Sequence, residues 1–260
     1  MRTTVVAIVA VAALALLGGI PLLTPLLGYD GASRSILTAA SIFATVGTLR
    51  AAGGFARGDY MRGAWLLQSA CYALIAIEFP LPRSPSLAGH IVGMVFVAVI
   101  NVLGVAGMIR FSRAFAISGL ELTGSRTRNG LIVAVAVLVA IALAGLPLYH
   151  SAEGVLAGDL TEVEAILSSL GDLVLLACVA PLLLSTLTVR GGLLVWPWAA
   201  LTASSVAWLL YDTQTLVPVL LPGMAPDRLA VWSNLWQGLA CVMAGVAGLL
   251  QRQLASPSAS

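Results

Sequence analysis

Eight continuous apolar segments constrain the fold of this chain more strongly than any other feature. Each is about 20 residues long, the length at which an α-helix crosses the ~30 Å hydrocarbon core of a bilayer. Their apolar residues are consecutive rather than alternating, which favours helices over the strands of a membrane β-barrel. The segments cover residues 4–27, 35–54, 63–80, 87–109, 130–149, 165–188, 192–212 and 229–250. We therefore predict an all-α integral membrane protein with eight transmembrane helices, forming a single polytopic domain over residues 1–260.

The shortage of charge leads to the same prediction. Of the 260 residues, 60% are hydrophobic and only 9% are charged, whereas about 25% of the residues in soluble domains are charged. The first segment also resembles a signal peptide, because Arg2 precedes it. Its apolar run is longer than the roughly 7–15 residues of such peptides, so we expect it to be retained. If it were removed, seven helices would remain in the same orientation.

The arginines predict how the helices are oriented. If the segments alternate in direction, ten arginines lie on the side of the N-terminus, and only Arg34, Arg83 and Arg228 lie on the other. Cytoplasmic loops of membrane proteins are rich in basic residues, so both termini, including the tail 251–260, are predicted to be cytoplasmic. The loop 150–164 contains four acidic residues and no arginine, and we expect it outside.

The absence of lysine excludes several functions. All 13 basic residues are arginine, so no lysine can form a Schiff base with retinal or pyridoxal phosphate, and no P-loop lysine can reach a nucleotide phosphate. The net charge of +2 is too small to indicate nucleic-acid binding. The sequence contains neither H-E-x-x-H nor G-x-S-x-G, and we predict no catalytic residue and no enzymatic activity.

A repeated motif suggests that the chain is a duplication. Residues 104–107 and 245–248 both read Gly-Val-Ala-Gly, near the ends of the fourth and eighth segments. Halves of four helices keep the same orientation, so residues 1–126 and 127–250 would form a parallel repeat with a site between them. The alternative is a chance match between helices rich in small and aliphatic residues.

Seven polar residues in the segments or at their ends are candidate ligand-binding residues. They are Glu78, His90, Asn101, His150, Asp172, Tyr211 and Asp212. Most lie near the outer ends of their segments, which predicts an outward-facing polar pocket. Asp172 lies deepest, ~9–12 Å along its helix, where an acid costs ~2.5–3.5 kcal/mol unless it faces a partner or water. Alternatively, Glu78, His150 and Asp212 are near enough to the interface to be simply solvated.

Helical spacing adds further polar side chains to this pocket. Residues three or four apart share a face of a helix, and three such stripes occur in the second half of the chain. They are Glu164, Ser168 and Asp172; Ser205, Trp208 and Asp212; and Asn234, Gln237 and Cys241. We expect these stripes to face the interior of the bundle.

The two histidines leave one cofactor hypothesis open. His90 and His150 lie on neighbouring predicted helices near the same side, and imidazole ligates haem iron and zinc. Their spacing matches no metal-binding signature, so we predict no cofactor and no metal site.

Part of the second half resembles a known class of membrane domain. Residues 168–176 (Ser-Ser-Leu-Gly-Asp-Leu-Val-Leu-Leu), 190–192 (Arg-Gly-Gly) and 207–212 (Ala-Trp-Leu-Leu-Tyr-Asp) carry the likeness. They resemble the last helices of the seven- or eight-transmembrane sensor input domains of bacterial signalling proteins, over about 45 residues, with Asp172 and Asp212 as matching acids. The resemblance implies a multi-pass protein of the bacterial inner (plasma) membrane, in contact with membrane lipids.

Three functions fit these observations. The first is a sensor or receptor-like module with an outward-facing polar pocket for a small molecule or lipid. Sensor input domains precede a cytoplasmic output domain, but here only the tail follows the last segment, so such a sensor would signal through a separate cytoplasmic or membrane partner protein. The second is a transporter or lipid-handling protein with Asp172 as its proton or substrate site. The third is an accessory structural subunit of a larger membrane complex.

Overall fold

The computed structural model describes residues 2–81, 86–117, 126–160, 162–188, 195–215 and 226–255, together with residues 217 and 223. Within the helices, some side chains also lie outside the described part. They are those of residues 2–17, of residues 115–117 and of a number of positions in the second half, Asp172 among them.

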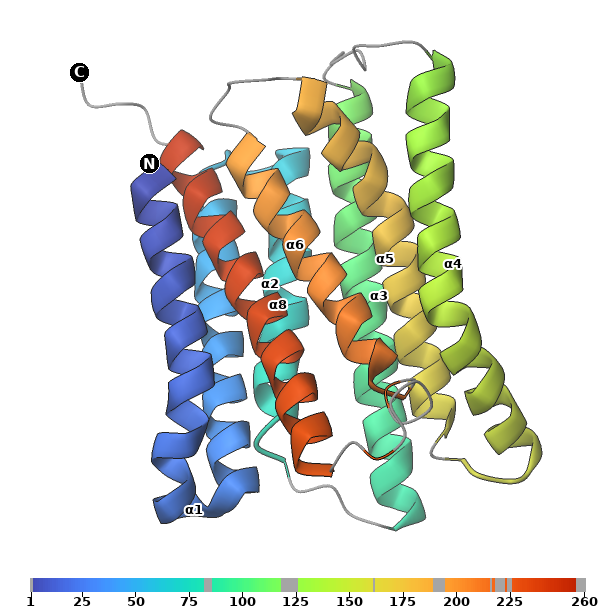
Figure 1. The fold of residues 1–260 in the computed structure, drawn as a ribbon. Helices are drawn as coiled ribbons and strands as arrows, with labels where there is room; N and C mark the ends of the chain where they lie inside the picture. Colours follow the sequence, from blue (N-terminus) through green and yellow to red (C-terminus); the bar gives the residue numbers. More distant parts are fainter. Residues whose placement is uncertain are drawn as a thin grey trace.

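The described chain is all-helical, as the apolar segments predict (Figure 1). No strand occurs among the described residues. The helices are α1 (Arg2–Ala52), α2 (Tyr60–Glu78), α3 (Leu87–Ile117), α4 (Arg126–Leu156), α5 (Glu162–Thr188), α6 (Val195–Asp212) and α8 (Pro226–Ala255), with a short 3-10 helix η1 (Thr213–Thr215) after α6. Four helical stretches are long and apolar enough to cross a membrane, namely Gly18–Ala52, Leu87–Ala114, Gly130–Leu156 and Arg228–Ala255.

The first helix contains two of the predicted segments. At Gly28 the backbone angles are φ 72° and ψ 166°, outside the helical region. A positive φ is readily adopted only by glycine, and here the chain turns back on itself (Figure 1). The second part, residues 29–52, begins before the predicted start at residue 35, because polar residues outside the apolar run continue the helix.

Six helical stretches pack in a ring. Residues 29–52 of α1 contact α2, α2 contacts α3, α3 contacts α5, α5 contacts α6, α6 contacts α8, and α8 contacts α1 again. Two further helices flank this ring. Residues 2–27 pack beside the second part of α1, with Gly19 against Ile36, and α4 packs beside α5. Along the chain, the same succession therefore occurs twice: one flanking helix is followed by three ring helices.

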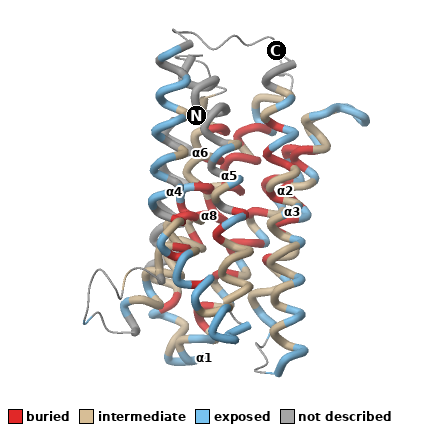
Figure 2. The backbone as a smooth tube through the Cα atoms, turned by 90° about the vertical axis from the view of Figure 1, so that its right-hand side faces the viewer, coloured by how far each residue is buried: buried red, intermediate tan, exposed pale blue. Residues whose placement is uncertain are grey.

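The interior is most densely packed where α1 meets α8. A Cβ atom on Gly47 would overlap the backbone of Gly245, and one on Gly248 would overlap the backbone of Gly47. Close approach of helices through glycine is typical of helix packing in membranes. Figure 2 shows buried residues gathered in the interior of the bundle, whereas α3 and α4 expose large apolar side chains, Val95 and Leu138 among them.

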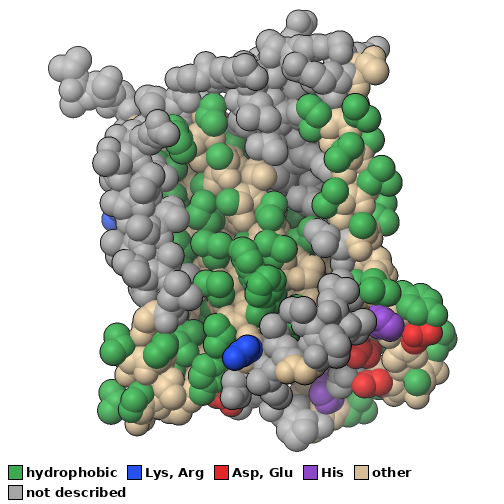
Figure 3. Space-filling model, viewed as in Figure 1, with side chains coloured by type: hydrophobic (Ala, Val, Ile, Leu, Met, Phe, Trp, Pro, Cys, Tyr) green, Lys and Arg blue, Asp and Glu red, His purple; other side chains and the backbone are tan. Residues whose placement is uncertain are grey.

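The two ends of the bundle differ in charge. We call them the Gly28 end and the Gly53 end, after the residues that lie there. α1 begins and α8 ends at the Gly53 end (Figure 1). Acidic and histidine side chains gather at the Gly28 end (Figure 3). Among them are Glu153, Asp159, Glu162 and Glu164.

Candidate functional site

A cavity of about 740 Å³ lies between α2, α3, α5 and α6. Small-molecule sites in proteins commonly measure ~300–1,000 Å³, so this cavity has the size of a ligand site. Its lining reaches the surface at the Gly28 end, where Leu81 is 43% exposed. Pro147 and Ser151 of α4, Gln214 of η1 and Gln237 of α8 complete the wall.

Five of the seven predicted ligand-binding residues line this one cavity. They are Glu78, His90, Asn101, Tyr211 and Asp212. His150 is not among the lining residues; its side chain is half exposed, and its Nδ1 lies 3.6 Å from a carboxylate oxygen of Glu153. The side chain of Asp172 lies outside the described residues.

The helical stripes identify part of the remaining polar lining. Glu164, Ser168, Ser205, Trp208 and Gln237 all line the cavity, and each belongs to a stripe of residues three or four apart. The cavity also contains residues that the sequence reasoning missed. They include Gln68, Cys71, Tyr72, Phe96, Ser151, Ser169, Ser204 and Gln214. Aromatic and amide residues inside apolar segments give no periodic signal that would separate a cavity wall from ordinary packing.

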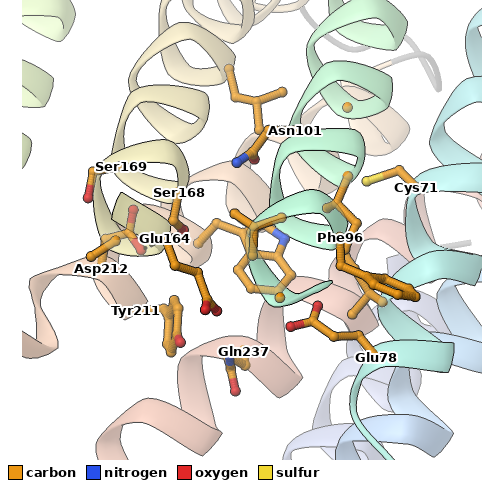
Figure 4. Close-up of a pocket in the computed structure, with 18 of the residues that line it drawn as sticks. Cys71, Glu78, Phe96, Asn101, Glu164, Ser168, Ser169, Tyr211, Asp212 and Gln237 are labelled. Carbon is orange, nitrogen blue, oxygen red and sulfur yellow. Dashed lines mark hydrogen bonds between the residues drawn. The ribbon is translucent and has the colours of Figure 1, made fainter. Parts of the chain in front are cut away.

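Three carboxylates contribute the acidic part of the lining. Figure 4 shows Glu78 on α2 and Glu164 on α5 reaching into the cavity. The Glu164 carboxylate lies directly against α3, because a Cβ built on Gly93 would be 3.1 Å from its Oε2 atom. The third carboxylate, Asp212, is buried at 7% exposure and accepts a hydrogen bond from the Ser168 hydroxyl at 3.2 Å.

An amide bridge ties α3 to α5 beside the cavity. The Nδ2 atom of Asn101 donates to the carbonyl oxygen of Leu167 at 2.9 Å. Gly171, one turn further along α5, leaves the space that the Asn101 side chain occupies, since a Cβ there would overlap it. A part-buried helical carbonyl that accepts a second hydrogen bond holds the amide in place, so this bridge sets the register between the two helices.

Buried aromatic residues close the bundle on the Gly53 side of the cavity. Phe111 lies between Trp65 and Trp198, with ring centroids 4.9 Å and 5.2 Å away, and all three rings are at most 2% exposed. Nearer the Gly28 end, the hydroxyl groups of Tyr72 and Ser204 lie 3.0 Å apart, and Ser204 donates to the carbonyl of Ala240 at 2.7 Å. The cavity therefore has an apolar, tightly packed floor.

The described acidic, histidine and cysteine residues form no group of three that could hold a metal ion. The structure thus does not bring His90 and His150 together with an acid in a ligand set. Compared with models of known protein families, with curated proteins and with solved structures, the chain gives no match.

Proposed function

We propose that this chain is a receptor-like module of the bacterial inner membrane, which binds a small molecule or lipid in the cavity from the outer side. One observation carries the proposal: five of the polar residues singled out from the sequence line one cavity of ligand size. Carboxylates in such a space favour a ligand site over a purely structural role, because a charged group within a membrane bundle is costly unless it faces a partner or water.

The proposed topology has eight membrane-crossing helices with the Gly28 end outside. The distribution of charge supports this orientation. Most arginines of the described residues lie at the Gly53 end, among them Arg50, Arg57, Arg62, Arg110, Arg113 and Arg252, whereas Arg34 and Arg228 lie at the Gly28 end. This majority agrees with the positive-inside rule for the cytoplasmic face. The aromatic floor closes the cavity toward that face, so a ligand would enter and leave at the Gly28 end.

The proposed architecture is a parallel repeat of two four-helix halves. The twofold order of helices around the ring supports it, because the succession of a flanking helix and three ring helices is the one that duplication would produce. The cavity then lies between α2 and α3 of one half and α5 and α6 of the other. Binding between two halves can alter their contact, which is how such a module would signal to a separate partner protein.

The proposal is tested by filling the cavity. Val97 lines it, whereas Val95, two residues away on α3, is 56% exposed and faces outward. The full chain, extracted with its native lipids into nanodiscs, is analysed by native mass spectrometry for a bound small molecule. We expect wild type and Val95→Trp to retain the bound molecule and Val97→Trp to lose it.

Comparing Val97→Trp with Val95→Trp distinguishes binding inside the cavity from nonspecific binding of lipids to the outer surface. A wild-type protein that carries no molecule, or equal retention in Val95→Trp and Val97→Trp, would contradict the proposed function.

A further inference from the structure

The charges in the cavity have one sign. The charged residues in its described lining are Glu78, Glu164 and Asp212, and no arginine is among them. The carboxylates come from three different helices, α2, α5 and α6, and surround the space rather than forming one surface cluster. Acidic groups in a cleft with low-dielectric walls produce a negative potential and attract cations. His90 is the only histidine in the described lining.

The size of the space disfavours an inorganic cation. Metal ligands must converge on one point at about 2.0–2.6 Å, and no three described acidic, histidine or cysteine side chains converge in this way. The volume of about 740 Å³ instead fits an organic molecule with several functional groups.

Aromatic rings accompany the carboxylates. Phe96, Trp208 and Tyr211 line the cavity, and the rings of Trp208 and Tyr211 meet edge to face with centroids 5.9 Å apart. The faces of aromatic rings attract organic ammonium groups, and tryptophan does so most strongly. Aromatic walls together with carboxylates are the surroundings that a quaternary or protonated amine requires.

The deeper part of the lining is uncharged, and its polar side chains, such as those of Gln68 and Tyr72, already form hydrogen bonds within the bundle. Ile75, Ile100, Met108, Leu175 and Leu201 line it toward the aromatic floor. No charged side chain lies among these five, so this part suits an apolar group. A ligand that satisfies both parts carries a cationic head near the Gly28 end and an apolar body that extends toward the floor.

We propose that the cavity binds an amphiphilic organic cation, an ammonium compound with an apolar body, held by Glu78 and Glu164 and by the surrounding aromatic rings. This inference rests on the proposed function, because it names the ligand class of the same cavity. It goes further by requiring positive charge on the ligand.

The test compares two probes that differ only in charge. One is 4-phenylbutyl-trimethylammonium, and the other is its neutral isostere, in which carbon replaces nitrogen. Binding of each to the full chain in zwitterionic nanodiscs is measured by equilibrium dialysis. We expect the wild type to bind the cation about tenfold or more tightly than the isostere, the scale of a charged pair in a partly desolvated site. Equal affinities would overturn the inference, and this comparison needs no variant.

Variants then test which carboxylates attract the cationic probe. We expect the double variant Glu78→Gln/Glu164→Gln to lose about tenfold in affinity for the cation, with the isostere changed by less than about twofold. Glu153→Gln is the matched control, because Glu153 is an exposed acid at the same end and does not line the cavity. An equal loss in the control, or no loss in the double variant, would overturn the assignment.

The outcomes separate this inference from the proposed function. If both probes bind equally and Val97→Trp abolishes both, the cavity is a ligand site without charge selection, and only the cation inference falls. If neither probe binds, the cation inference also falls, while the proposed function is decided by the native ligand found in the mass spectrum.

Discussion

The contact between α1 and α8 and the contact between α3 and α5 occupy equivalent places in the ring of helices, yet they are built differently. We call the first the closed seam and the second the open seam. In the closed seam, backbones touch through Gly47, Gly245 and Gly248. In the open seam, Asn101 bridges to the Leu167 carbonyl, and the cavity lies alongside.

The repeated Gly-Val-Ala-Gly motif shows how the two seams diverge. In α8, Gly245 and Gly248 face α1 and allow its backbone to approach. In α3, by contrast, Gly107 faces α2, where a Cβ would lie 2.7 Å from Nε2 of Gln68. The same motif thus brings two backbones together in one half, whereas in the other the atoms nearest Gly104 belong to the side chains of Cys71 on α2 and Leu175 on α5. Small residues decide which of two equivalent contacts can hold a cavity.

The largest expected effect is at the closed seam. Gly248→Leu places a side chain where the Gly47 backbone lies, and backbone cannot move aside as a side chain can. We expect a loss of about 3 kcal/mol or more in the free energy of unfolding, at the upper end for an overpacked core, or no folded protein at all. Thermal unfolding in detergent, followed by circular dichroism, measures the change.

Gly145→Leu on α4 is the matched control for this substitution. Nothing lies within 4 Å of a Cβ at Gly145, so the same change in residue type meets open space. We expect its midpoint of unfolding to stay near that of the wild type. A similar loss in both variants would mean that glycine is needed for helix flexibility rather than for the contact between α1 and α8.

A smaller effect is expected at the open seam. In Gly171→Ala the new methyl group meets the end of the Asn101 side chain, which can rotate away at the expense of its hydrogen bond to Leu167. A hydrogen bond of this kind contributes about 1 kcal/mol, and we expect a loss of that size. Asn101→Ala should cost a similar amount, and the double variant should cost little more than either single one. Additive losses in thermal unfolding would show that the two residues do not act as a pair.

Much of the helical fold can be predicted from the sequence, because an apolar run of this length has one stable form in a membrane. The reversal at Gly28 also leaves a signal, since the polar residues there interrupt the apolar run. The order of helices around the ring leaves none: many pairings of apolar helices bury similar surface. The roles of Gly47 and Gly245 become clear only from the structure, in which α1 and α8 approach each other at these two residues.

The residues of the candidate site likewise fall into those that the sequence predicts and those that depend on how the helices are arranged. Spacing of three or four residues on one helix identifies Glu164 and Trp208 as members of polar stripes, because that relation is local. His150 carries the same local signal of a polar residue near a helix end. It does not line the cavity, although Pro147 and Ser151 on the same helix do. Which face of the flanking helix α4 meets the ring depends on contacts between distant segments.

The smallest expected change in stability comes from removing one serine hydroxyl from each seam, and these two variants should differ in ligand binding rather than in stability. Ser41 in the closed seam donates to its own helix at the Leu37 carbonyl, 2.8 Å away, and lies 3.5 Å from the sulfur of Cys241. Ser168 beside the open seam donates to Asp212. Ser41→Ala and Ser168→Ala each remove one hydroxyl, and we expect either to change the free energy of unfolding by about 1 kcal/mol or less.

Binding should separate this matched pair. Ser168→Ala removes the hydrogen-bond donor to Asp212 in the cavity wall, which alters the polar surface that a ligand would contact. We therefore expect retention of the bound molecule in native mass spectrometry to fall. Ser41→Ala alters no lining residue, so retention should stay at the wild-type level. If Ser41→Ala lowered retention as much as Ser168→Ala, binding would depend on the packing of the whole ring, and the division into a closed seam for stability and an open seam for binding would be wrong.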